Sequence, residues 1–118
     1  MRRVLIVDDE VDLLLALSVL LQSSGYQVFE ARTGAGGLAA AEREKPDVVI
    51  LDVGLPDVSG VEVLRQLRER GTQAAILVLS AHASRHTERS AAAEGADAYV
   101  TKPFNPDELL QTLDRLLG

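Results

Sequence analysis

Five short apolar runs, most of them rich in branched side chains, recur along the 118-residue chain. Three of them do not alternate with polar residues, which is typical of strands that are buried on both faces of a sheet. The runs are Val4–Val7, Tyr26–Phe29, Val48–Leu51, Ala75–Leu79 and Ala98–Val100. The pattern therefore predicts five strands.

Segments with a helical spacing of apolar residues lie between these runs. Glu10–Ser24 has one apolar stripe, and we expect Asp9 to cap its start and Gly25 to end it. The stripe consists of Leu13, Leu14, Leu17, Leu20 and Leu21. Leu38–Glu44 ends before Pro46, because the residue that precedes a proline is disfavoured in a helix. The remaining predicted helices are Gly60–Arg70, roughly residues 84–94, and the segment that follows Asn105.

The last two predicted helices differ in the sequence features that support them. Asn105 is a good cap, and Pro106 suits the first helical position. The segment at roughly residues 84–94 has no leucine, isoleucine or valine, so its buried face must come from Ala91–Ala93. Each missing large side chain forgoes about 1.5–3 kcal/mol of burial. We expect this helix to be the most loosely packed, with His86 exposed.

Strands that alternate with helices five times predict an α/β fold, in which a parallel sheet carries helices on both faces. The length suits one domain over residues 1–118, and no linker or internal repeat interrupts it. A net charge of −6 and 3% aromatic residues argue against direct nucleic-acid binding. No apolar run approaches the ~18 residues of a membrane span, and cysteine is absent, so we expect a cytoplasmic protein that does not enter the membrane.

Polar side chains follow four of the predicted strands at their carboxyl ends. Asp8 and Asp9 follow the first strand, and Asp52 follows the third. Ser80 follows the fourth strand, and Lys102 lies just beyond the fifth. Because the carboxyl ends of parallel strands meet at one edge of a sheet, we expect these groups to converge.

Three carboxylates, a hydroxyl and an ammonium group suit one kind of chemistry. Neighbouring carboxylates repel one another and favour a bound cation, and Mg²⁺ prefers oxygen ligands. One carboxylate can then attack phosphorus, while the ammonium and the hydroxyl offset the charge of the transferred group. Each group alone is more often a cap or a solvated charge. The prediction depends on their coincidence.

Six motifs occur in order along the chain: Val7–Glu10, Leu51–Pro56, Gly60, Leu79–Ala81, Gly95–Tyr99 and Thr101–Phe104. In sequence and spacing they resemble the receiver domain of two-component response regulators, over essentially the whole chain. The resemblance implies a flavodoxin-like fold with the strand order 2-1-3-4-5. It also implies that Asp52 is the phospho-acceptor, and that Asp8, Asp9, Asp52 and the backbone carbonyl of Gly54 hold Mg²⁺.

The resemblance implies roles for the other residues as well. Lys102 would pair with the phosphoryl group, with a cis peptide bond to Pro103. Ser80 would move toward the phosphorylated site and Tyr99 would turn into the vacated space. This movement would remodel the face made by the fourth helix, the fifth strand and the fifth helix.

Gly54 and His82 stand at positions that influence the lifetime of the acyl phosphate in this family. Gly54 has no side chain, which should leave the approach of water open. A histidine at position 82 can orient a water molecule or obstruct it. We expect substitutions at both positions to change the lifetime.

The implied phosphoryl donor is a phosphohistidine on a sensor histidine kinase or a histidine phosphotransfer protein. The domain would catalyse its own phosphorylation and slow hydrolysis, so it is not expected to be a conventional multiple-turnover enzyme. A homodimer through the fourth helix, the fifth strand and the fifth helix is left open.

Three alternatives remain at this point. A haloacid-dehalogenase-like phosphatase would use Asp8 as the nucleophile, but Glu10 stands where an aspartic acid belongs and no second acidic pair follows Lys102. An interaction module independent of phosphorylation would be expected to have a damaged acidic pocket. A flavodoxin-like mononucleotide binder would need a phosphate-binding loop after the first strand, and none is present.

Overall fold

The computed structural model describes residues 1–81 and 85–118 of the chain. Five parallel strands form one sheet in the order β2-β1-β3-β4-β5, which confirms the α/β fold and the strand order that the resemblance implies. The strands are β1 (Arg3–Val7), β2 (Gln27–Ala31), β3 (Val48–Asp52), β4 (Ala75–Ser80) and β5 (Ala98–Thr101).

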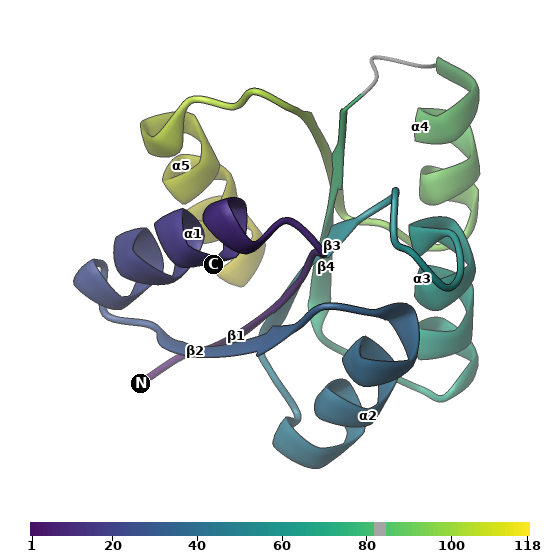
Figure 1. Ribbon diagram of the computed structural model, residues 1–118, viewed down its shortest axis with the longest axis horizontal. Helices are drawn as coiled ribbons and strands as arrows, with labels where there is room; N and C mark the ends of the chain where they lie inside the picture. Colours follow the sequence, from purple (N-terminus) through teal and green to yellow (C-terminus); the bar gives the residue numbers. More distant parts are fainter. Residues whose placement is uncertain (82–84) are drawn as a thin grey trace.

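Helices cover both faces of the sheet. Those in the described ranges are α1 (Val11–Ser23), α2 (Gly34–Glu44), α3 (Gly60–Glu69), α4 (Arg85–Ala93) and α5 (Pro106–Leu117). Helices α1 and α5 lie on one side, and α2, α3 and α4 lie on the other (Figure 1). No helix in the described part of the chain is long and apolar enough to cross a membrane.

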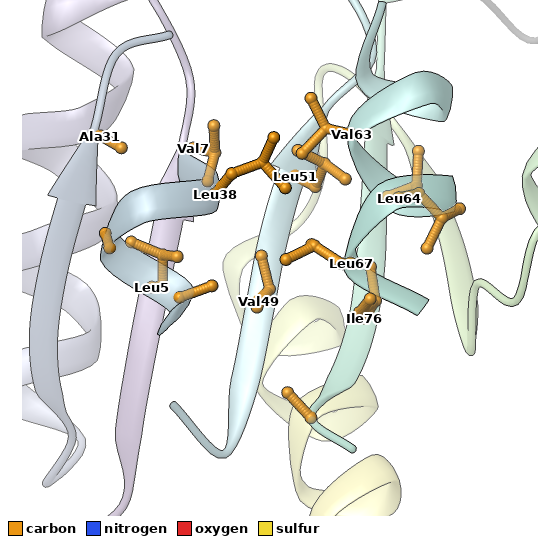
Figure 2. Packing of buried hydrophobic residues seen from close by; sticks show 14 of the residues in the cluster. Leu5, Val7, Ala31, Leu38, Val49, Leu51, Val63, Leu64, Leu67 and Ile76 are labelled. Carbon is orange, nitrogen blue, oxygen red and sulfur yellow. The ribbon is translucent and has the colours of Figure 1, made fainter. Parts of the chain in front are cut away.

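The strand residues alternate between two hydrophobic layers, because successive side chains of a strand point to opposite faces. Leu5 and Val7 of β1 pack in the layer beneath α2 and α3, whereas Val4 and Ile6 pack in the layer beneath α1 and α5. Figure 2 shows the first of these layers, in which side chains of β1, β3 and β4 meet those of α2 and α3. All five residues of β3 are buried, so this strand is the centre of the molecule.

The start of α1 differs from the prediction. The helix begins at Val11, and Glu10 occupies the cap position without a side-chain hydrogen bond. Asp9 lies one residue too early to cap the helix, so that prediction is wrong. Instead, Asp8 Oδ1 accepts a hydrogen bond from the backbone N–H of Glu10 at 2.9 Å.

Helix α2 begins at Gly34, four residues earlier than predicted. The side chain of Thr33 caps it and accepts a hydrogen bond from the backbone N–H of Gly36 at 2.9 Å. Glycine is unfavourable within helices, which hides this start in the sequence. Hydrogen bonds from the backbone N–H groups of Gly34 and Ala35 to Asp57 stabilise this glycine-rich turn.

Helix α4 buries less than predicted. Among its described residues only Ala91 is buried, and Ala92 and Ala93 are exposed. Successive helical residues are turned by about 100° from one another, so three in a row cannot all face the core. His86 is exposed, as predicted.

Candidate functional site

Three carboxylates meet at the carboxyl edge of the sheet. Asp52 is the last residue of β3 and is 5% exposed, and Asp8 directly follows β1 and is fully buried. Asp9 is half-buried, and one oxygen from each of the three side chains lies within 4.8 Å of the other two. The structure therefore brings together the carboxylates that the sequence analysis selected. Their oxygen atoms are ligands that suit Mg²⁺.

The ammonium group of Lys102 lies among these carboxylates. Its Nζ atom is 3.0 Å from Asp8 Oδ2 and 3.3 Å from Asp52 Oδ1. It also donates a hydrogen bond to Glu10 Oε1 at 3.1 Å. The peptide bond between Lys102 and Pro103 is cis, the isomer that the resemblance implies. Sequence reasoning missed the role of Glu10 as a partner of Lys102, because no helical or strand pattern relates residues of such separate elements.

The pKa values of two site residues reflect this environment. Burial raises the pKa of Asp52 above its ordinary value, and the charge of Asp8 raises it further; Lys102 and the backbone of Gly54 only partly offset the rise. Burial lowers the pKa of Lys102, but hydrogen bonds to Asp8 and Glu10 and the nearby charges outweigh it, so its pKa is raised. A cation bound beside Asp52 would favour its charged form.

The loop of residues 53–59 follows Asp52 and carries Gly54. At its base, the backbone N–H of Gly60 donates to the carbonyl oxygen of Val53 at 2.8 Å. A Cβ atom at Gly60 would lie 2.2 Å from the carbonyl oxygen of Asp52, so only glycine allows the loop to close this tightly. Gly54 is exposed, and a Cβ atom there would lie 3.8 Å from Asp52 Oδ2. The closed loop keeps Gly54 beside the carboxylate.

The remaining predicted site residues lie at the ends of β4 and β5. Ser80 is the last residue of β4 and is 4% exposed, and its carbonyl oxygen accepts a hydrogen bond from the backbone N–H of Lys102 at 2.7 Å. Tyr99 is half-buried in β5 and packs against the layer beneath α2 and α3. His82 lies outside the described residues. The structure thus brings Asp8, Asp9, Asp52 and Lys102 together. It places Ser80 at the end of β4, the strand that pairs with β3.

Comparison with known proteins identifies the family. Residues 4–114 match the family described as the response regulator receiver domain. The chain belongs to this family. Receiver domains are signalling modules of two-component response regulators rather than conventional enzymes.

Relatives of this receiver domain include proteins that are longer than this chain and proteins of similar length. It is 52% identical over 113 residues to the transcriptional regulatory protein KdpE of Mycobacterium tuberculosis, an alignment that covers 96% of this chain and 50% of KdpE. The chain thus spans about half the length of this relative. It is 35% identical over 120 residues to protein PilH of Pseudomonas aeruginosa, covering 100% of this chain and 99% of PilH.

Solved structures agree with the assignment. A CheY-like receiver domain protein from Methanospirillum hungatei JF-1 superposes with a TM-score of 0.95 and 33% identity, over 99% of this chain and 94% of the other. The response regulator TrrA of Thermotoga maritima, solved in complex with Mg²⁺-BeF, gives a TM-score of 0.90 and 38% identity, over 99% of this chain and 100% of TrrA. The fold and the family assignment are therefore consistent.

Proposed function

We propose that this receiver domain accepts a phosphoryl group on Asp52 in a reaction that requires Mg²⁺. The observation that carries the proposal is the convergence of Asp8, Asp9 and Asp52 within 4.8 Å, with Lys102 Nζ 3.3 Å from Asp52. Such a cluster offers a nucleophile, oxygen ligands for a cation and a second positive charge in one place.

Asp52 acts as the nucleophile in this proposal. One of its carboxylate oxygens forms a bond to phosphorus while the bond between phosphorus and the imidazole nitrogen of a phosphohistidine breaks. The electron pair of the broken bond leaves with the imidazole ring. Lys102 offsets negative charge on the transferred group from its position beside Asp52. Later attack by water on phosphorus releases inorganic phosphate and restores the carboxylate.

The residues at this edge fit a magnesium ion. Asp8, Asp9 and Asp52 supply carboxylate oxygens, and we assign the backbone carbonyl of Gly54 as a further ligand. When bound, Mg²⁺ would neutralise charge on the phosphoryl oxygens. The relative TrrA was solved with Mg²⁺-BeF, which supports a magnesium site in this receiver domain too.

An apolar stripe on α1 supports docking of a phosphohistidine protein, either a sensor histidine kinase or a histidine phosphotransfer protein. Val11, Leu15 and Val19 are 54%, 64% and 56% exposed. They are four residues apart, so they share one helix face, and the stripe begins two residues after Asp9. A donor helix packed on this stripe would be next to the site.

Substitution of this stripe tests the docking surface. With a purified phosphohistidine donor, Leu15→Glu should slow phosphorylation by roughly tenfold or more, because a charge without a partner in an apolar contact is costly. Its rate with a small phospho-donor should stay at the wild-type value. Ala16→Glu is the matched control, because it adds the same charge at an exposed position of the helix that is turned by about 100° from Leu15. Equal rates for Leu15→Glu and wild type with the protein donor would contradict docking here.

The output is proposed to run through Ser80 and Tyr99. Ser80 ends β4, and Tyr99 lies in β5, which pairs with β4 and follows α4 and precedes α5 in the chain. Movement of Ser80 toward the phosphoryl group and a turn of Tyr99 would remodel the α4-β5-α5 face. A second copy of this chain is a candidate partner for that face, and sedimentation velocity before and after phosphorylation would distinguish a dimer from a monomer.

Mapping the modified carboxylate tests the proposal against its alternatives. The domain is treated with acetyl phosphate and Mg²⁺, the acyl phosphate is reduced with borohydride, and the labelled peptide is sequenced by mass spectrometry. We expect the label on Asp52. A label on Asp8 would support the phosphatase alternative, and no label would support an interaction module independent of phosphorylation.

A further inference from the structure

Asp57 joins the loop of residues 53–59 to the start of α2. Its Oδ1 atom accepts a hydrogen bond from the backbone N–H of Gly34 at 2.7 Å, and its Oδ2 atom accepts one from Ala35 at 3.0 Å. These are the first two residues of α2, whose N–H groups have no partner within the helix. A carboxylate at this position also interacts favourably with the helix dipole.

Two further observations show that this contact is built into the fold. The hydrogen bonds from Ala35 and Gly34 hold the pKa of Asp57 below its ordinary value, so the side chain carries its charge at neutral pH. A Cβ atom at Gly34 would lie 2.6 Å from Val58 Cγ2 and 3.2 Å from Asp57 Oδ1. The loop therefore approaches α2 this closely because residue 34 is glycine.

The same loop carries a proposed ligand of the metal. Asp52 stands immediately before it, Gly54 lies near its start, and Asp57 lies near its end. The hydrogen bond from Gly60 to Val53 closes the base of the loop at 2.8 Å. The loop is thus held at its base by the start of α3 and beyond Gly54 by the start of α2.

We propose that Asp57 is a positioning residue for the magnesium site, because its two hydrogen bonds to α2 fix the loop and keep the backbone of Gly54 beside Asp52. This inference rests on the proposed Mg²⁺ site. Asp57 acts through the loop and does not itself touch the metal. Removing a residue that orients metal ligands typically weakens binding about 10- to 100-fold, and we expect Asp57→Ala to lie near the lower end, about 10-fold.

The test compares Mg²⁺ affinity with stability in the full chain. Isothermal titration with MgCl₂ is performed on wild type, Asp57→Ala, Asp57→Asn and Thr33→Ala, and melting temperatures are measured in EDTA. Thr33 is the matched control, because it caps the same helix through Gly36 and its hydrogen bond stays within that turn. Both alanine variants should melt earlier than wild type, but only Asp57→Ala should bind Mg²⁺ more weakly. Asp57→Asn retains one oxygen acceptor and should fall between Asp57→Ala and wild type.

The outcomes separate this inference from the proposed function. Wild-type affinity in Asp57→Ala would overturn the positioning role, while Mg²⁺ binding by the wild type would leave the proposed metal site standing. An equal loss of affinity in Thr33→Ala and Asp57→Ala would also overturn it, because the effect would then come from the stability of α2. No Mg²⁺ binding by the wild type would overturn both proposals.

Discussion

Asp52 is a carboxylate held almost out of water between a second carboxylate and an ammonium group. Only 5% of the residue is exposed, and Lys102 Nζ lies 3.3 Å from its Oδ1 atom. Burial makes the charged form of this side chain costly and so raises its pKa. A cation bound there would offset part of this cost, which would link metal binding to the proposed reactivity of this residue.

The lifetime of the proposed phosphoryl group on Asp52 is also expected to depend on single residues. Gly54 is exposed and a Cβ atom there would lie 3.8 Å from Asp52 Oδ2, so a side chain added there would stand close to a phosphoryl group carried by Asp52. We predict that Gly54→Asn and His82→Ala each change the rate at which the phosphorylated domain loses phosphate. The decay is followed by intact mass after removal of the donor, with Gln111→Ala as an exposed control on α5. Unchanged decay in both variants would contradict this role.

The residues of the site were predictable to different degrees. Asp8 and Lys102 directly follow strands and Asp52 ends one, and a parallel sheet brings the ends of its strands to one edge. The partners Glu10 and Asp57 were not predicted. Their contacts depend on side-chain directions across separate elements, which no periodic pattern records.

At the scale of elements, α1 and α4 differ in how firmly they are packed. Helix α1 buries Leu14, Leu17 and Leu21, whereas the described residues of α4 bury only Ala91. Alanine removes far less apolar surface from water than leucine does, so less free energy opposes local opening of α4. A weakly held helix is suited to a shift between two conformations.

Hydrogen exchange measures this difference directly. We predict that amides of α4 exchange faster than those of α1 in the unmodified domain, because fewer buried contacts oppose opening. Phosphorylation should change exchange in α4 and β5 and leave the centre of α1 unaffected. Helix α1 in the same sample is the internal reference. Equal protection of the two helices would contradict the loose packing of α4.

The boundaries of the elements show where sequence patterns lose information. The leucine stripe of α1 predicted a helix that the structure confirms to within one residue at each end. The first turn of α2 was not predicted, since Gly34 and Gly36 argue against a helix on propensity alone. Contacts of that turn with the loop of residues 53–59, which lies more than 15 residues away in sequence, stabilise it.

For the whole molecule, the strand pattern alone predicted a parallel α/β sheet, and the resemblance supplied the strand order. The order follows from how crossovers are arranged, which hydrophobic periodicity does not encode. The chain spans about half the length of KdpE. The comparison with KdpE therefore does not identify the partner that responds to this receiver domain. The residues proposed for the chemistry itself lie at one edge of the sheet.

Phosphoryl incorporation measured by intact mass tests the central claim most directly. Wild type and Asp52→Asn are incubated with acetyl phosphate, each with Mg²⁺ and with EDTA. We predict that one phosphoryl group is added to the wild type in the presence of Mg²⁺, and that EDTA or the Asp52→Asn substitution abolishes the addition. Equal incorporation by Asp52→Asn and wild type, or incorporation that does not depend on Mg²⁺, would contradict the account.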